Sequence, residues 1–187
     1  MTNEDITRIA QHLRRIHETS DPRRLCRCLD INIDYLPMGS GNSALKGLIT
    51  RNNRCATISI NSDQPEKTQA IVLFHEIGHY VLRHHKRKQV CAFHDYGIFD
   101  NASELEDEAN RFVAEYLLEN KETLDILQTS CDFFKAAAVL RVPKEILDYK
   151  MRMLRYYNLL TAECPIYTKR NCMGTIDCSG IENDSYV

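Results

Sequence analysis

The pentapeptide His-Glu-Ile-Gly-His at residues 75–79 is the feature that most restricts what this chain can become. His75 and His79 are four residues apart, so in a helix of 3.6 residues per turn they lie on one face. Two imidazole nitrogens placed in this way can bind one Zn²⁺. Glu76 flanks that face, where its carboxylate can take the proton of a water molecule that attacks a carbonyl. The pattern therefore predicts a zinc-dependent hydrolase with Glu76 as its base.

The alternative interpretation is a core helix that carries two hydrogen-bonded histidines. The chain has 7 histidines, and about 0.02 chance occurrences of HExxH are expected in it. Residues 70–82 are largely apolar, which predicts a buried helix, and such a helix rarely carries two histidines and a glutamate unless something satisfies them. We therefore favour the metal site. Gly78 costs about 1 kcal/mol relative to Ala inside a helix, so it predicts a close approach by another element.

The next part of the chain offers His85 as a weaker candidate for the third ligand. In the metzincin pattern HExxHxxGxxH the last histidine corresponds to His85, but the glycine position is Leu82 here. Without that glycine we expect the helix to run from about residue 64 to about residue 85, which turns His85 about 240° away from His79. His84 and His85 are then expected to belong to a solvated, basic helix end.

A second predicted helix, beginning near residue 102, offers glutamates as the third ligand. Glu106 and Asn110 are four residues apart and share one side of this helix. Glu106 would complete a His₂Glu set, and Asn110 can form a hydrogen bond with a ligand histidine. Ser103 and Glu106 also fit a capping box, which is a purely structural role. On these residues alone the third ligand stays open, and the rivals of Glu106 are Glu104, Glu108, Cys91 and His94.

"HEIGHY" followed by "ELEDEANRFVAEYLL" resembles the ImmA/IrrE family of metallopeptidases, over roughly residues 30–120. The resemblance implies that Glu106 is the third metal ligand. It also implies a small gluzincin-like α+β core followed by helices, and a protein substrate such as the helix-turn-helix repressor of a phage or mobile element. The chain departs from the family pattern at Val113 and at residues 119–120, and we expect neither departure to affect the metal chemistry.

Peptide hydrolysis also needs a donor, besides the metal, for the negative charge that forms on the carbonyl oxygen. The sequence does not choose among the candidates for this donor. They are Tyr80, His94, Tyr96 and Tyr116.

The remaining pattern predicts an α+β fold. Alternating apolar residues indicate strands at 31–37, 45–50 and 55–61, and helices are expected at 3–18 and over most of 120–157. We expect a small antiparallel sheet packed on the active-site helix pair, followed by a mainly helical C-terminal part. The predicted domains are a metallopeptidase core at 1–128 and a helical segment at 129–187. The strand at 55–61 is a candidate to pair with an extended substrate.

The C-terminal segment shows an imperfect helix-turn-helix pattern. Ala137, Arg141 and Ile146 are spaced as in that motif, but Arg141 stands where glycine is usual. The basic residues of this face are Arg141, Lys144, Lys150, Arg152 and Arg155. Because the net charge of -2 gives little attraction to phosphates, we favour a helical bundle over direct DNA binding.

A second function is therefore considered, a zinc-containing regulatory protein that acts on DNA or a partner through these helices. A structural zinc site has no need of Glu76, so its presence favours the peptidase.

Composition supports a cytoplasmic location. No apolar run approaches the ~20 residues of a membrane span, and the polar start does not read as a signal peptide. The 8 cysteines form no CxxC pair, which argues against a structural zinc knuckle. The sequence leaves the role of three tail cysteines open, namely Cys164, Cys172 and Cys178.

Overall fold

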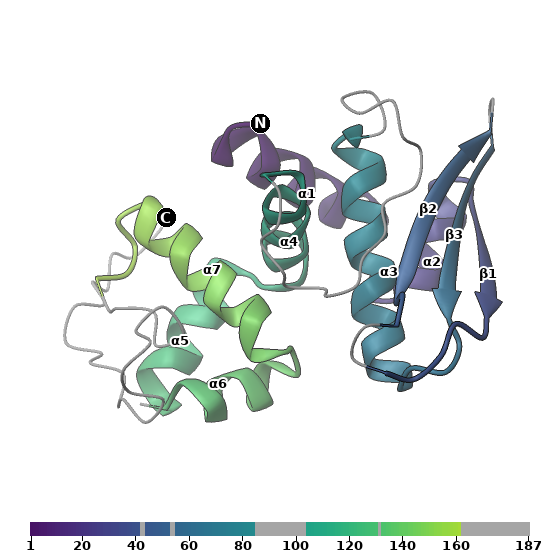
Figure 1. Ribbon diagram of the computed structural model, residues 1–187. Coiled ribbons are helices and arrows are strands. Elements are labelled where there is room, and N and C mark those ends of the chain that lie inside the picture. The colour runs from purple at the N-terminus through teal and green to yellow at the C-terminus, as the bar shows by residue number, and fades with distance from the viewer. Residues whose placement is uncertain (42–43, 53–54, 85–103, 131, 162–187) are drawn as a thin grey trace. The chain divides into compact units, whose positions relative to one another are not determined.

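The computed structural model describes the whole chain except residues 42–43, 53–54, 85–103, 131 and 162–187 (Figure 1). The chain divides into two compact units, Met1–Tyr116 and Leu117–Val187. The domain boundary expected near residue 128 stays a prediction. The three tail cysteines, Cys164, Cys172 and Cys178, lie outside the described residues.

The first unit has the predicted α+β composition. In chain order its elements are α1 (Asn3–His17), α2 (Pro22–Cys28), β1 (Ile31–Leu36), β2 (Gly47–Asn52), β3 (Cys55–Asn61), α3 (Glu66–Val81) and α4 (Glu104–Leu117). The side chain of Thr2 caps α1 by accepting from the Asp5 amide. Asp21 caps α2 in the same way, and Pro22 begins that helix. Short polar caps therefore mark where both N-terminal helices start.

The three strands form a mixed sheet in the order β1-β3-β2. Strands β2 and β3 are antiparallel, as expected, with Ile49 opposite Ile58. Strand β1 is parallel to β3, with Ile33 opposite Ile58, so the expectation of a wholly antiparallel sheet is wrong. The alternation of apolar residues identifies strands and their buried faces, but it does not determine which edge of a hairpin a third strand joins.

The central position of β3 overturns one functional expectation. Both edges of β3 are occupied by β1 and β2, so the strand at 55–61 cannot pair with a substrate. Within the part of the chain that the structure describes, β1 and β2 form the edges of the sheet.

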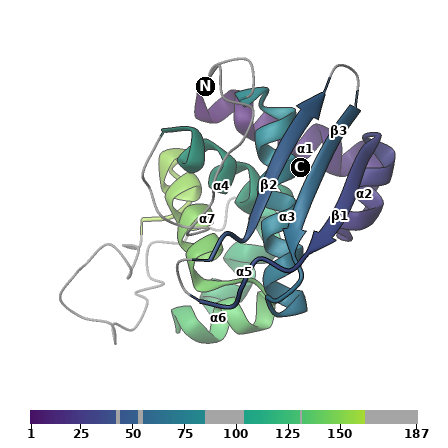
Figure 2. The same ribbon diagram turned by 45° about the vertical axis from the view of Figure 1, so that its right-hand side comes forward.

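Helices α2 and α3 lie on the same face of the sheet (Figures 1 and 2). Ala56, Ile58 and Ile60 of β3 are buried together, as their alternation predicts. At one edge of this layer, β2 approaches α3 so closely that a Cβ added to Gly47 would lie 2.5 Å from Val72 Cγ1. The sheet is therefore a rigid support against which α3 is held.

Helix α4 packs against α3 on the side away from the sheet (Figure 1). A Cβ added to Gly78 would lie 3.1 Å from Phe112 Cδ1 and 3.3 Å from the Ala109 carbonyl oxygen. The close approach predicted from Gly78 is confirmed, and the approaching element is α4. Helix α1 is tied to α4, because Arg111 donates a hydrogen bond of 2.7 Å to Asn3 Oδ1.

Helix α3 is shorter than expected. It ends at Val81, with Leu82 as its C-cap, and Arg83 adopts the left-handed conformation with φ 59°. The expectation that the helix continues to residue 85 is therefore wrong. His85 lies outside the described residues, but His84 is fully buried, so its assignment to a solvated helix end is also wrong.

The second unit contains α5 (Asn120–Ser130), α6 (Phe133–Leu140) and α7 (Lys144–Tyr156), in agreement with the predicted helical segment. Arg141 ends α6 in the left-handed conformation, with φ 58°, which a helix-turn-helix glycine adopts without strain.

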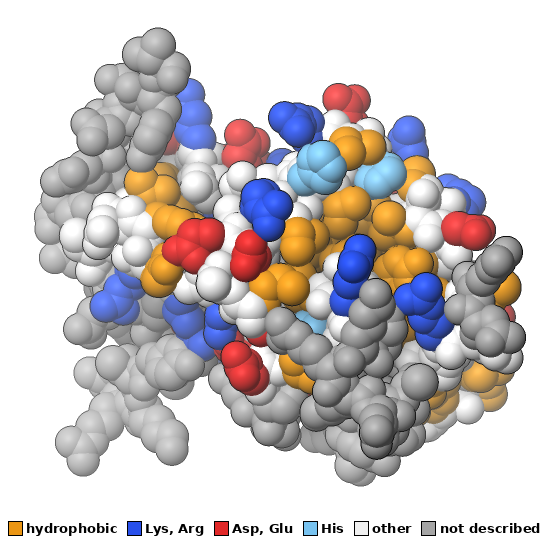
Figure 3. All heavy atoms as spheres, turned by 90° about the horizontal axis from the view of Figure 1, so that it is seen from above, with side chains coloured by type: hydrophobic (Ala, Val, Ile, Leu, Met, Phe, Trp, Pro, Cys, Tyr) orange, Lys and Arg blue, Asp and Glu red, His pale blue; other side chains and the backbone are white. Residues whose placement is uncertain are grey.

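The basic face expected on this segment is smaller than the sequence suggested. Lys150 is only 1% exposed, so it cannot contact a phosphate. Lys and Arg side chains are interspersed with Asp and Glu on the face of the molecule shown in Figure 3.

In the described part of the chain, no helix combines the length and the apolar character that crossing a membrane requires.

The contact between α3 and α4 can be tested at Gly78. We expect Gly78→Val to lower the free energy of unfolding by about 1–3 kcal/mol, because the added methyl groups overfill a packed interface. Chemical denaturation measures this change. The same substitution at Gly41, where an added Cβ would meet nothing within 4 Å, is expected to change stability by less than about 0.5 kcal/mol. Equal effects at both positions would contradict the close contact.

Candidate metal centre

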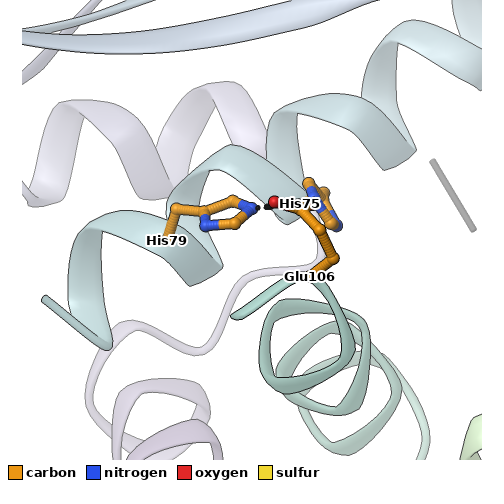
Figure 4. Close-up of side chains that lie close together, drawn as sticks. All are labelled: His75, His79 and Glu106. Carbon is orange, nitrogen blue, oxygen red and sulfur yellow. Dashed lines mark hydrogen bonds and ion pairs between the residues drawn. The ribbon is translucent and has the colours of Figure 1, made fainter. Parts of the chain in front are cut away.

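Helices α3 and α4 bring three potential metal ligands to one point (Figure 4). His75 Nε2 lies 2.9 Å from His79 Nε2, and Glu106 Oε2 lies 3.0 Å from the former and 3.3 Å from the latter. A tetrahedral ion with bonds of about 2.1 Å separates its donors by about 3.4 Å. Small side-chain movements are therefore enough for these three atoms to share one ion.

Both imidazoles are buried, and His79 is in the protonation state that a metal requires. His75 and His79 are 0% and 1% exposed. Burial, more than any other influence, lowers the pKa of His79 to about 4, although the nearby carboxylate of Glu106 opposes this shift. At neutral pH His79 is therefore uncharged, and a ring nitrogen can offer its lone pair to a cation.

The carboxylate of Glu106 supplies negative charge beside these neutral rings. Burial raises its pKa, but the nearby imidazoles of His75 and His79 outweigh burial and hold the pKa below the usual value of a glutamate. Glu106 is thus ionised at neutral pH. Two neutral imidazoles and one carboxylate are a ligand set of catalytic zinc sites, so the residues present fit this ion.

Asn110, on the next turn of α4, fixes the proton of His75. Its side-chain oxygen, Oδ1, lies 2.9 Å from His75 Nδ1, and an amide oxygen can only accept a hydrogen bond. His75 Nδ1 therefore carries the proton and donates it. The lone pair of this ring is left on Nε2, which is the nitrogen that faces His79 and Glu106.

Glu76 follows His75 on α3 but is not part of the ligand cluster. The group of residues whose donor atoms lie within 4.8 Å of one another contains His75, His79 and Glu106. Glu76 is fully buried on α3, and a Cβ added to Gly47 of β2 would lie 3.5 Å from its Oε1. The carboxylate of Glu76 is therefore held between α3 and β2.

The other candidates for the third ligand were Glu104, Glu108, Cys91 and His94. Glu104 is exposed at the start of α4, and Cys91 and His94 lie outside the described residues. Glu108 is fully buried, but its Oε2 lies 3.0 Å from His84 Nε2 rather than in the ligand group.

The structure also reduces the choice of the additional oxyanion donor. The hydroxyl of Tyr116 donates to the Thr19 carbonyl at 2.8 Å. Ten residues of helix, or about 15 Å, separate Tyr116 from Glu106. Tyr116 is therefore unsuited to that role. Tyr80 is partly exposed next to His79 and remains a candidate, whereas His94 and Tyr96 lie outside the described residues.

Sequence reasoning missed the pair formed by His84 and Glu108. His84 Nδ1 lies 2.8 Å from His79 Nδ1. His84 therefore contacts the ring nitrogen of His79 that is not in the ligand cluster. The only signal in the sequence was the presence of His84 itself, because its position depends on the end of α3 and on the left-handed turn at Arg83.

The chain is similar to known proteins. Residues 26–152 match the family model described as the IrrE N-terminal-like domain, Peptidase_M78. The chain is also 26% identical, over 159 residues, to a protein of Bacillus subtilis (strain 168) named metallopeptidase ImmA. That alignment covers 82% of this chain and 88% of the relative.

The hydrogen bond from His75 to Asn110 leads to a prediction about metal affinity. We expect Asn110→Leu to weaken zinc binding about 10- to 100-fold, because the ring of His75 loses the acceptor that holds its proton on Nδ1. Competition with a chromophoric chelator measures the dissociation constant. Asn110→Asp keeps an acceptor oxygen and is expected to bind zinc more tightly than Asn110→Leu. Wild-type affinity in Asn110→Leu would show that this hydrogen bond does not support the site.

Proposed function

The chain belongs to the IrrE N-terminal-like family and is a metallopeptidase, and from this premise we propose that it is a zinc-dependent endopeptidase. The observation that carries the proposal is the convergence of His75 Nε2, His79 Nε2 and Glu106 Oε2. We propose these three residues as the zinc ligands, and Asn110 as the residue that orients His75.

Zinc held there would polarise the scissile carbonyl as a Lewis acid and would make a water molecule more acidic. Glu76 is the proposed general base, because it follows the proposed ligand His75 directly on α3 and has the carboxylate that this role requires. In this role Glu76 takes a proton from the attacking water and then passes it to the nitrogen of the leaving amine. The carboxylate ends each cycle ionised, ready to accept the next proton.

Strand β2 is the proposed binding site for the backbone of the substrate. It forms an edge of the described sheet, and its first residue, Gly47, lies beside Glu76. An extended peptide that adds to this edge would be held by main-chain hydrogen bonds. Its scissile bond would then lie close to Glu76. Strand β2 thus takes the role that the sequence had suggested for β3.

The proposed substrate is a regulatory protein in the cytoplasm, specifically a helix-turn-helix repressor encoded by a phage or mobile element. The support for this step is the resemblance of the two motif helices to the ImmA/IrrE family. One of the five basic residues expected on the C-terminal helices, Lys150, is buried, which reduces the basic surface available for DNA and favours a protein target.

Glu76→Gln separates metal binding from chemistry. The amide cannot accept the proton of water as a base, so we expect cleavage of the proposed repressor substrate to fall by at least about 10²-fold. Zinc content is expected to stay at the wild-type level, because Glu76 is not among the proposed ligands. Mass spectrometry of the products gives the rate, and elemental analysis gives the metal content.

Two reference variants complete that experiment. Glu106→Ala is expected to lose both zinc and cleavage. Glu66→Gln makes the same chemical change as Glu76→Gln at an exposed position on the same helix, and it is expected to keep both. Equal cleavage by the wild type and Glu76→Gln would exclude the general-base role, and full zinc content in Glu106→Ala would exclude the third ligand.

A further inference from the structure

His84 is a buried histidine for which the proposed reaction gives no direct role. It follows Leu82, the C-cap of α3, and Arg83, whose left-handed conformation turns the chain back toward the helix. The side chain of His84 is 0% exposed. Burying an imidazole is costly unless both ring nitrogens have hydrogen-bonding partners, and its two contacts show what these partners are.

The two ring nitrogens of His84 join a candidate metal ligand to a buried carboxylate. His84 Nδ1 lies 2.8 Å from His79 Nδ1, and His84 Nε2 lies 3.0 Å from Glu108 Oε2. The rings of His79 and His84 meet edge to face, with centroids 4.9 Å apart. Both Glu108 and His84 are excluded from solvent, so water does not compete for these hydrogen bonds.

The order of donors and acceptors along this chain of groups follows from elementary chemistry. An ionised carboxylate only accepts, so with Glu108 ionised the proton of this contact is on His84 Nε2, which donates it to Glu108. The other nitrogen of a neutral His84, Nδ1, then has a lone pair and accepts from His79 Nδ1. His79 is left with its own lone pair on Nε2, the atom that lies 2.9 Å from His75 Nε2 and 3.3 Å from Glu106 Oε2.

We propose that His84 and Glu108 are positioning residues that hold His79 in the tautomer required for metal binding, with its proton on Nδ1. The proposal rests on the proposed zinc site. It gives His79 the support that Asn110 gives to His75. In both cases the outer nitrogen of a ligand histidine donates to a fixed acceptor, which also fixes the orientation of the ring.

Helix α4 supplies the residues that support both ligand histidines. Glu106, Glu108 and Asn110 are at alternate positions of its first two turns. Glu106 reaches the metal ligands directly, Asn110 reaches His75, and Glu108 reaches His79 through His84. The turn at Arg83 makes the last connection possible, because it places a histidine between α4 and the outer side of His79.

Nuclear magnetic resonance of the metal-free protein, labelled with ¹⁵N in its histidine rings, tests the proposal directly. In the wild type we expect His79 to carry its proton on Nδ1 and His84 to carry its proton on Nε2. A wild-type His84 with its proton on Nδ1 would overturn the proposal, whether or not any variant folds.

Substitution gives the second arm of the test. His84→Leu is expected to leave His79 in a mixture of tautomers and to weaken zinc binding about 10- to 100-fold. His84→Gln offers both a donor and an acceptor, and it is expected to recover most of that affinity. The matched control is His12→Leu on the exposed surface of α1, which should bind zinc as the wild type does.

The outcomes separate this proposal from the proposed function. If Glu106→Ala loses zinc while His84→Leu keeps wild-type affinity and a single His79 tautomer, the zinc site stands and the role of His84 is excluded. If Glu106→Ala also keeps zinc at the wild-type level, the proposed site itself is wrong. Loss of affinity in both His84→Leu and His84→Gln, with the His79 tautomer unchanged, would indicate a purely structural role and would overturn the proposal.

Discussion

The close contact between α3 and α4 is the constraint on which the rest of the site depends. Gly78 has no side chain, and an added Cβ would lie 3.3 Å from the carbonyl oxygen of Ala109. Because the helix backbones approach this closely, side chains on their facing turns can meet. The His75–His79 pair on α3 thereby comes within hydrogen-bonding distance of Glu106 on α4. A larger residue at position 78 would widen the gap between the donors that a single ion must bridge.

The ligand histidines and the proposed general base lie on different sides of α3. Its histidines face α4, where a carboxylate and an amide hold their ring nitrogens in place. Glu76 lies next to β2, beside Gly47. In the proposed reaction, metal binding and proton transfer therefore use different supports within one helix. The edge strand that supports Glu76 is also the one to which an extended substrate would add.

Much of this arrangement could be predicted from the sequence, because it depends on local geometry. The helical spacing of His75 and His79 places both rings on one face, and Gly78 correctly indicated a close helix. The shared side of Glu106 and Asn110 was also evident, although only the family resemblance distinguished Glu106 from its rivals. The parallel pairing of β1 with β3 was not predictable, since it depends on contacts between distant parts of the chain.

The buried position of His84 could not be predicted from the sequence, for a different reason. Arginine rarely adopts a φ of 59°, because the left-handed conformation is unfavourable for residues with a Cβ. A sequence pattern without glycine at the end of α3 therefore predicts a longer helix and an exposed histidine. Tertiary packing outweighs this local preference, and the result is a buried His84 between His79 and Glu108.

The central claim is that one metal ion binds where α3 meets α4. A crystal structure of zinc-loaded protein, with an anomalous difference map measured at the zinc edge, tests it most directly. The account predicts one strong peak at about 2.0–2.2 Å from the Nε2 atoms of His75 and His79 and from a carboxylate oxygen of Glu106. A map whose strong peak lies on other residues, with none between these three, would contradict it.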